Sequence, residues 1–431
     1  MTTPVSATRR AAPPVRAPRE MSYLRILAQG LTPATSAPTP VEAVRRQLAI
    51  QGQQVSAVPH AILSRTGPSV TRLEVDEAFE TGQLVRSWPM RGTVHITTAA
   101  DHHWLRVALR HRLDTWALNS RRSFGVDETV LARAEEVTLT LLAERGSVRR
   151  AELLGAWAEA GLMEPFAGHD VSSYRRRHLL VHLQREGVLV QGPRRGNEHL
   201  VVDATALPPA ESGPGGAGGG AHGTDGHRAA VAEIARRYAT SHGPVAAADL
   251  ARWTTLPAAQ CRQGLEDAVE LTSASGYAVD AAGGHVPLTR VRTEGGLRGS
   301  VTVLGADPGA LPRGREANQV GYMRADLPDL LAASRRRAAG THFLASFDEV
   351  HVGYKDRACL TDAAGERLIC PAANGMFRPL LVDRGRVVAV RPAGAGLLWA
   401  DDARRSARLE RDVERAVRDV ERRLARPVER T

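Results

Sequence analysis

The sequence has few aromatic residues, few cysteines and almost no lysine. Only 4% of its 431 residues are aromatic, so leucine, valine and alanine must fill its cores. The three cysteines (Cys261, Cys359 and Cys370) form no CxxC pair and no Cys/His cluster. This spacing argues against a disulfide framework and a zinc finger, and it favours a reducing cytosol. We therefore expect a cytoplasmic protein.

Long apolar runs are missing as well. No stretch of about 18 apolar residues occurs, so we expect no membrane-spanning helix and no membrane partner. The charges near the N-terminus are not followed by an apolar core, so we expect no secretory signal. Hydrophobic residues still make up 43% of the chain, which is ample for folding. The length predicts two to four domains.

The basic residues are almost all arginine. Lys355 is the only lysine among 57 basic residues, and the formal net charge is +10. This charge favours a polyanionic partner, and guanidinium groups suit contacts to phosphates and bases. A GC-rich genome would produce the same preference for arginine. Charge alone also leaves RNA and membrane surfaces open as partners.

Composition divides the chain into folded and irregular segments. Residues 1–38 are typical of a largely disordered basic tail, in which residues 21–31 (MSYLRILAQGL) are compatible with a short helix. Residues 207–226 are rich in glycine and predict a flexible linker. A second irregular stretch, at about 292–320, predicts a long loop.

A pattern of helix, turn, helix and basic β-hairpin recurs between these segments. The clearest copy covers residues 146–203, and another occupies about 40–98. In a third, weaker copy the hairpin is expected around 268–280. Helix-turn-helix followed by a basic hairpin is typical of winged-helix domains. The predicted winged-helix modules are residues 39–129, 130–206 and 227–340, the last with a loop insertion.

The C-terminal part has a different pattern. Residues 341–400 alternate strand-like runs with turns, which predicts a small antiparallel sheet or barrel. Residues 401–431 predict a charged helix with a solvated face. The fold class expected for the whole chain is α+β.

Six segments occur in the order found in one known protein family. They are IQGQQVSAVPHAILSR, MRGTVHITTAADHHWL, EGVLVQGPRRG, SHGPVAAADLARWTTLP, FDEVHVGYKDR and NGMFRPLLVDRGRVVAV. Over roughly residues 40–400 the chain resembles the bacterial winged-helix DNA glycosylases of the AlkZ type. These enzymes excise alkylated purines and unhook crosslinks.

The resemblance carries implications for fold, activity and partners. It implies three tandem winged-helix modules and a small C-terminal β-barrel around a C-shaped DNA-binding cleft. It implies hydrolysis of the N-glycosidic bond of bulky N7-alkylated purines by a water-using, monofunctional enzyme. Its substrates would be monoadducts or, in a self-resistance branch, interstrand crosslinks made by genotoxic natural products. We expect double-stranded DNA as the partner, a monomer on the nucleoid, and neither a metal nor a cofactor.

The catalytic signature of that family is Gln-apolar-Gln or Gln-apolar-Asp, and here it falls on Gln51-Gly52-Gln53. Glycine at the middle position departs from the usual larger residue, and Gln54 adjoins the motif. N7 alkylation makes the purine a cationic leaving group, so the enzyme mainly has to position water and tolerate a cationic sugar. A glutamine amide can accept a hydrogen bond from that water.

The spacing of the two glutamines makes a structural prediction. Residues i and i+2 share a face in an extended segment and diverge in a helix. If Gln51 and Gln53 act on one centre, a helix that ends near Ile50 must stop before them, and Gly52 permits the break. The competing interpretation is a polar cluster that only solvates a helix end.

Arginines at two other places are candidates for DNA contact. Arg194 and Arg195 lie in the turn of a predicted wing, and Arg175, Arg176 and Arg177 lie at the start of a predicted helix. Solvated surface positions are the competing interpretation for all five.

Further candidates come from the family segments. Arg91 and His95 recur in the family pattern as DNA-contact candidates, and a structural role is the more common one for a lone histidine. Four residues of FDE and GYKDR are expected to tie the barrel together: Asp348, Glu349, Tyr354 and Asp356. An acid beside Lys355 is expected to hold the Lys355 amine protonated.

Two other functions fit parts of the sequence. A non-enzymatic winged-helix regulator would share the charge and the repeats, but would not depend on Gln51 and Gln53. A metal-dependent nuclease or deaminase is a third class. The absence of the paired H-x-E and P-C-x-x-C motifs argues against a zinc deaminase.

Overall fold

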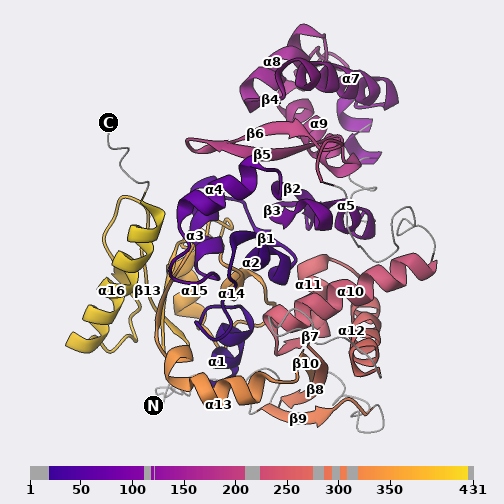
Figure 1. Cartoon of the computed structure of the whole chain (residues 1–431). Helices are drawn as coiled ribbons and strands as arrows, with labels where there is room; N and C mark the ends of the chain where they lie inside the picture. Colours follow the sequence, from indigo (N-terminus) through magenta and orange to yellow (C-terminus); the bar gives the residue numbers. More distant parts are fainter. Residues whose placement is uncertain are drawn as a thin grey trace, which may run out of the picture.

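The computed structural model describes residues 19–110, 118–120, 122–208, 224–274, 286–293, 301–307 and 319–425. The fold is mixed α+β with three antiparallel sheets, as Figure 1 shows. Three units have the order helix, short strand, two helices and a hairpin or meander, and a C-terminal part follows them.

The first unit contains the candidate catalytic motif. Its elements are α2 (Pro40–Gln47), β1 (Ile50–Gln51), α3 (Val58–Leu63), α4 (Arg72–Glu80), β2 (Leu84–Met90) and β3 (Thr93–Thr98). The Thr39 side chain caps α2 by accepting from the Glu42 N–H, and Thr71 and Glu74 form a capping box on α4. A short 3₁₀ turn, η1 (Val55–Ala57), precedes α3.

The second unit repeats this order and shares a sheet with the first. Its elements are α7 (Glu128–Arg145), β4 (Ser147–Val148), α8 (Arg150–Glu159), α9 (Ser172–Glu186), β5 (Leu189–Arg195) and β6 (Glu198–Asp203). Helix α5 (Ala99–Ala108) follows the first unit. The two hairpins meet where Arg86 of β2 pairs with Gln191 of β5, giving the strand order β1-β3-β2-β5-β6-β4. This shared sheet places the second unit beyond β2 (Figure 1).

The third unit corrects one prediction. Its elements are α10 (Thr224–His242), β7 (Val245–Ala246), α11 (Ala247–Thr254), α12 (Ala258–Ser273), β8 (Leu288–Thr293), β9 (Val301–Gly305) and β10 (Val320–Arg324). The hairpin expected around 268–280 is wrong as far as the described residues go, because α12 continues to Ser273. Leu265, Ala268, Val269 and Thr272 of α12 recur at helical spacing and are buried. Strand β9 lies inside the stretch that was expected to be a loop.

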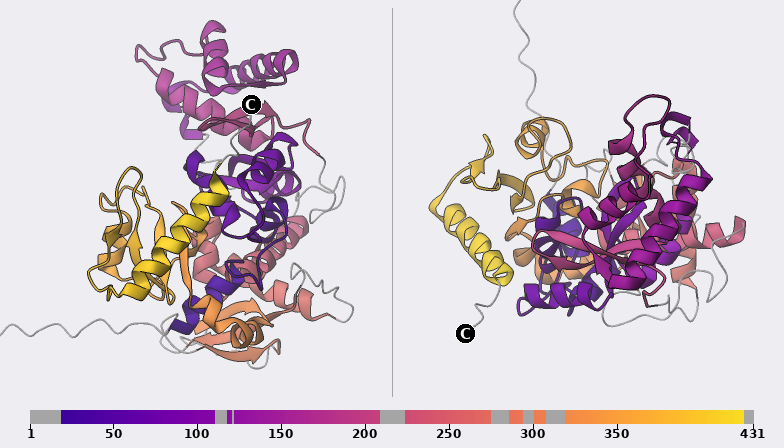
Figure 2. Two further views of the ribbon diagram at one scale, coloured as in Figure 1. Left: turned by 60° about the vertical axis from the view of Figure 1, so that its left-hand side comes forward. Right: turned by 90° about the horizontal axis from the view of Figure 1, so that it is seen from above.

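The C-terminal part contains an open sheet in place of the expected barrel. Its elements are α13 (Leu327–Ala338), β11 (Thr341–Leu344), α14 (Glu349–Val352), α15 (Ala363–Ile369), β12 (Leu380–Asp383), β13 (Arg386–Val390), β14 (Leu398–Trp399) and α16 (Ala407–Leu424). Among the described residues its strands pair in the order β11-β12-β13-β14 without closing. Helix α16 packs Leu409, Val413 and Val417 against the sheet and lies across it in Figure 2. A helix on that face leaves no interior for a barrel.

The N-terminal segment agrees with its prediction in one part. Helix α1 (Arg19–Ala28) corresponds to the short helix with which residues 21–31 were compatible, inside a tail that was otherwise expected to be disordered. Met21, Ile26 and Leu27 are buried in a core that also contains Leu331 of α13. Burial of this apolar face against the C-terminal part orders the segment from Arg19 onward. Residues 1–18 lie outside the described part of the chain.

Candidate active site

The backbone becomes extended at the candidate motif, as the i, i+2 argument predicted. Helix α2 ends at Gln47, and Leu48 turns the chain with φ 64° and ψ −49°. Strand β1 then pairs with β3, with Gln51 opposite His95. The Gly52 N–H donates to the Val94 carbonyl at 2.8 Å and so continues the pairing. The prediction that the helix stops before Gln51 is confirmed.

Gly52 is explained by its close contact with β3. A Cβ at this position would lie 2.9 Å from Cδ1 of Ile96 and 3.2 Å from its Cγ1. Ile96 is fully buried in the core of the first unit. Because Gly52 has no side chain, this segment can lie directly on β3. The Gly52 carbonyl accepts from Nε of Arg86 at 2.9 Å.

This packing predicts the effect of restoring a larger apolar residue. We expect Gly52→Leu to push β1 away from β3 and to lower the free energy of unfolding by about 1–3 kcal/mol, as overpacking of a filled core does. Thermal melts measure this loss. Gly52→Leu combined with Ile96→Ala should recover most of it, because the second change removes the colliding atoms. Equal melting temperatures for Gly52→Leu and the wild type would contradict the packing argument.

The amides of both motif glutamines reach the turn between β2 and β3. Oε1 of Gln51, which is half-buried, accepts from Nη2 of Arg91 at 3.3 Å. Oε1 of Gln53, which is exposed, accepts from the Val94 N–H at 3.4 Å. Within the described residues, no hydrogen-bond partner is assigned to either amide nitrogen. Two amide groups with unused donors thus lie at one end of the hairpin.

Arg91 occupies a strained turn beside Gln51. Arg91 and Gly92 have φ of 54° and 65°, the pair of positive values that a type I′ hairpin turn requires. A non-glycine residue in this region costs on the order of 1 kcal/mol, and such strain concentrates at functional sites. The Arg91 side chain is 11% exposed, and its Nη2 lies 2.9 Å from Nε2 of His95.

His95 is a buried, neutral partner of that guanidinium. Burial, followed by the charge of Arg91, lowers the pKa of His95 to about 3. Its Nδ1 lies 2.9 Å from the Thr93 carbonyl, so Nδ1 carries the proton and Nε2 accepts from Arg91. With no exposed surface, His95 is suited to position Arg91.

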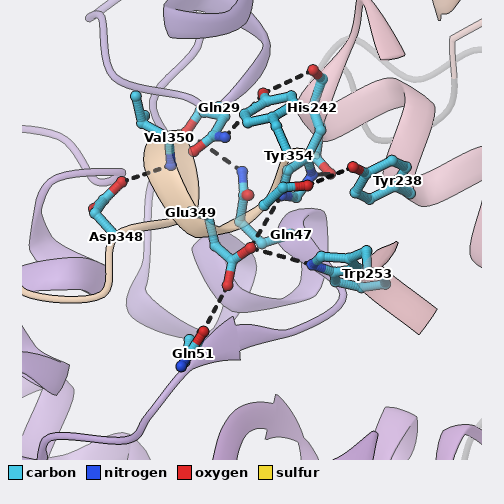
Figure 3. Close-up of polar contacts among 12 residues, drawn as sticks. Gln29, Gln47, Gln51, Tyr238, His242, Trp253, Asp348, Glu349, Val350 and Tyr354 are labelled. Carbon is cyan, nitrogen blue, oxygen red and sulfur yellow. Dashed lines mark hydrogen bonds and ion pairs between the residues drawn. The ribbon is translucent and has the colours of Figure 1, made fainter. Parts of the chain in front are cut away.

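A buried carboxylate from the C-terminal part lies behind Gln51 (Figure 3). Oε1 of Glu349 accepts from the Gln51 N–H at 3.0 Å, and its Oε2 accepts from Nε1 of Trp253 at 3.1 Å. Nε2 of His242 lies 3.5 Å from Oε2, and Nη2 of Arg91 lies 4.0 Å from Oε1. Glu349 is fully buried, yet it is fixed from several sides.

Glu349 stays ionised in this environment. Burial raises the pKa of its carboxyl, but the His242 hydrogen bond and the Arg91 charge outweigh burial and lower the pKa to about 2. Burial lowers the pKa of His242, which is therefore neutral near pH 7. Arg91 is thus the permanent positive charge facing Glu349.

A second buried pair joins the same parts of the fold. Arg65 of the first unit forms a bidentate ion pair with Asp348, and both N–O distances are 2.9 Å. The Tyr354 hydroxyl donates to the carbonyl of His242 at 2.8 Å. The FDE and GYKDR residues were expected to tie a barrel together. Asp348, Glu349 and Tyr354 instead connect the C-terminal part to the first and third units, whereas Asp356 accepts from the Ala358 N–H within the C-terminal part.

Two arginines near the site were missed by the sequence interpretation. Burial lowers the pKa of Arg91 and of Arg357, and the charge of Arg252, which is exposed on α11, lowers both further. Arg252 lies in the SHGPVAAADLARWTTLP segment and Arg357 in FDEVHVGYKDR. Both segments are among the six that resemble the family, but they are far apart in the sequence, so their proximity in the fold could not be predicted.

The remaining DNA candidates do not join this group. Arg194 is almost buried and pairs with Asp76 at 2.7 Å, and the exposed Arg195 pairs with Glu80 at 2.8 Å. Arg175 is buried, and its guanidinium donates to backbone carbonyls, including that of Phe124 at 2.9 Å. These three guanidinium groups are thus engaged within the protein.

Arg176 and Lys355 are both exposed. Among the described residues no acid forms an ion pair with Lys355, and the Asp356 carboxylate accepts from the Ala358 N–H at 2.9 Å. The Lys355 N–H donates to Asp249 at 2.8 Å.

Among the described residues, no group of three or more His, Cys, Asp and Glu side chains is arranged to hold a metal ion. None of the helices in the same part of the chain combines the length and the hydropathy needed to cross a bilayer.

A family model and a solved structure are similar to this chain. A family model described as DNA glycosylase AlkZ-like matches residues 44–430. The solved structure of the Streptomyces sahachiroi DNA glycosylase AlkZ is similar to this chain, with a TM-score of 0.64 and 20% identity. The alignment covers 94% of this chain and 96% of that one, and at this identity it shows the fold alone. No curated protein matches the sequence. Because the family model spans most of its length, the chain belongs to the AlkZ-like DNA glycosylase family.

Proposed function

We propose that this chain is a monofunctional DNA glycosylase that hydrolyses the N-glycosidic bond of bulky N7-alkylated purines in duplex DNA. Interstrand crosslinks would be among its substrates, in repair or in self-resistance to a genotoxic natural product. One observation carries the proposal. The amides of Gln51 and Gln53 both accept from the β2–β3 hairpin, from Arg91 and from the Val94 N–H, and buried Glu349 accepts from the Gln51 backbone N–H.

The two glutamines are the groups proposed to act on water and sugar. An amide oxygen can accept two hydrogen bonds, and Arg91 uses one of those of Gln51. The second can accept from a water molecule that attacks the sugar carbon. The amide N–H groups of both residues can donate to the sugar or to a phosphate. An alkylated purine leaves without strong protonation, so this uncharged pair suffices for the hydrolysis.

Arg91, His95 and Glu349 are proposed as positioning residues. Glu349 holds the backbone of Gln51 and faces Arg91, while His95 accepts from Arg91. Arg91 in turn orients the carbonyl oxygen of Gln51. A fixed negative charge behind the motif also favours the positive charge that develops on the sugar.

Duplex DNA is proposed to bind along the three units. Their element order is that of winged-helix domains, and we propose that together they form a concave DNA-binding surface. Arg252 and Arg176 are exposed and available for phosphates, and Arg357 is partly exposed. A bulky adduct cannot enter a closed base pocket, so an open surface suits it.

The lysine content allows a test of the water-using mechanism. Bifunctional glycosylases attack the sugar with an amine and form a Schiff base. Apart from the N-terminus, the only amine in the chain is that of Lys355. We expect Lys355→Arg to keep excision within about twofold of wild type, because the proposed chemistry belongs to Gln51 and Gln53. Borohydride should trap no protein–DNA adduct, and the product should be an abasic site cut only by alkali. A trapped adduct that disappears in Lys355→Arg would refute the mechanism.

A further inference from the structure

A large groove begins one residue after the candidate motif. Its volume is about 810 Å³, and Gln54 lies at its edge. The opposite walls come from the C-terminal part: Phe343, Pro371, Met376, Phe377 and Pro392 contribute apolar surface. This volume falls within the range of pockets that bind organic ligands.

The groove is connected to the candidate site at two places. In an extended chain each residue advances about 3.3 Å, so Gln54 lies within about 10 Å of Gln51. On the other wall, Phe377 lies 6.0 Å from the guanidinium of Arg357 and packs edge-on to His351 at 4.9 Å. Arg357 pairs with Glu366 at 3.3 Å, and burial together with the charges of Arg252 and Arg91 lowers its pKa. The groove therefore lies beside the segment that carries the glutamine pair.

The surface of the groove suits an aromatic occupant that is attached to a polyanion. Met376 is 57% exposed, which is unusual for a large apolar side chain unless it serves a contact. Phe343 forms part of the wall, and the guanidinium of Arg391, which pairs with Glu421 of the same groove at 2.6 Å, lies 5.9 Å from its ring centroid. Arg378 also lines the groove. Apolar walls with guanidinium groups fit a hydrophobic substituent whose carrier is phosphorylated.

We propose that this groove binds the apolar, aromatic substituent on N7 of the damaged purine. This assignment rests on the proposed function and extends it, because it names the class of adduct that the enzyme prefers. A substituent about 10 Å long reaches the groove from a base at Gln51, whereas a methyl group ends before it. The enzyme thus selects adducts by the substituent on N7, which binds in the groove and not in a pocket for the base.

Filling the groove tests the assignment. Ala393 lines the groove and is exposed, so Ala393→Trp can occupy the space without disturbing a core. Ala158→Trp, at an exposed position of α8, is the matched control. The probes are duplexes that carry one N7-(4-phenylbenzyl)guanine or one N7-methylguanine, on a 2′-fluoro sugar for the binding measurements. The wild type should bind the phenylbenzyl duplex at least tenfold more tightly than the methyl duplex, a difference of about 1.4 kcal/mol.

Ala393→Trp should reduce this preference to within twofold and leave binding of the methyl duplex unchanged, while Ala158→Trp retains the preference. Equal binding of both duplexes by the wild type would overturn the assignment. A parallel loss for both duplexes in Ala393→Trp would overturn it too, because the groove would then hold the DNA strand itself.

Base release from the same lesions on ordinary deoxyribose separates the two proposals. If the wild type binds the phenylbenzyl duplex more tightly but releases neither base, the glycosylase proposal is refuted and the groove assignment stands. If the wild type releases N7-methylguanine but binds both duplexes equally, the glycosylase proposal stands and the groove assignment is refuted.

Discussion

Replacing both motif glutamines, Gln51→Ala with Gln53→Ala, is expected to lower excision of N7-methylguanine from duplex DNA at least about a thousandfold. Removal of one preorganised polar group from an active site typically costs about a hundred- to a thousandfold in rate, and here two are removed. DNA affinity and melting temperature should stay near wild type. Gln53 is exposed and Gln51 half-buried, and neither side chain fills a core. Single-turnover release of the free base measures the effect.

Gln54 provides a matched control for this prediction. It adjoins the motif, but its amide nitrogen donates to the Ser56 hydroxyl at 3.0 Å and not toward the Arg91 turn. Gln54→Ala should excise N7-methylguanine at close to the wild-type rate. A large loss in Gln54→Ala with full activity in the double variant would show that the motif is displaced by one residue. A collapse of the melting temperature in the double variant would indicate a structural role for the pair.

Glu349→Gln is expected to have the second largest effect, about a hundredfold in single-turnover rate. The amide can still accept from the Gln51 N–H, but the negative charge opposite Arg91 is lost. Removal of one partner from a buried charge pair costs about 3 kcal/mol, so the melting temperature should fall as well. Assays are made well below that temperature, where DNA affinity should remain unchanged. A rate loss with unchanged affinity distinguishes positioning of Gln51 and Arg91 from general unfolding.

The pH profile adds an independent readout for Glu349. Its folded pKa of about 2 lies below the ordinary value, so the stability it contributes is present above about pH 4.5 and is lost as pH falls toward 2. Excision by the wild type should therefore show no titration of this group between pH 5 and 8. Glu266→Gln, in the ion pair with Arg290 of the third unit, is the matched control and should keep the wild-type rate. A hundredfold loss in that control would remove the special role of Glu349.

Local features of the site could be predicted from the sequence. The i, i+2 spacing of Gln51 and Gln53 required an extended segment, and β1 provides it through pairing with β3. The helix that ends before the motif followed from the same argument. The i, i+2 argument succeeds because it concerns only the geometry of neighbouring residues, although the strand itself is completed by β3.

Features that depend on distant segments could not be predicted. Glu349 contacts the Gln51 backbone across 298 positions of sequence, and no local pattern marks that pairing. Helix α1 is buried against α13, and no pattern within residues 21–31 marks this contact with a distant segment. The expected barrel is an open sheet because α16 covers one of its faces, and strand patterns alone do not distinguish the two.

Release of free base from a duplex that contains N7-methylguanine, measured by chromatography in the presence of EDTA, tests the central claim most directly. The account predicts that the wild-type chain releases the free alkylpurine and leaves an intact strand with an alkali-labile abasic site. It also predicts that Gln51→Ala with Gln53→Ala binds the same duplex and releases nothing above the spontaneous rate. Binding without release by the wild type, as a winged-helix regulator would show, would contradict the account, and so would release that stops in EDTA.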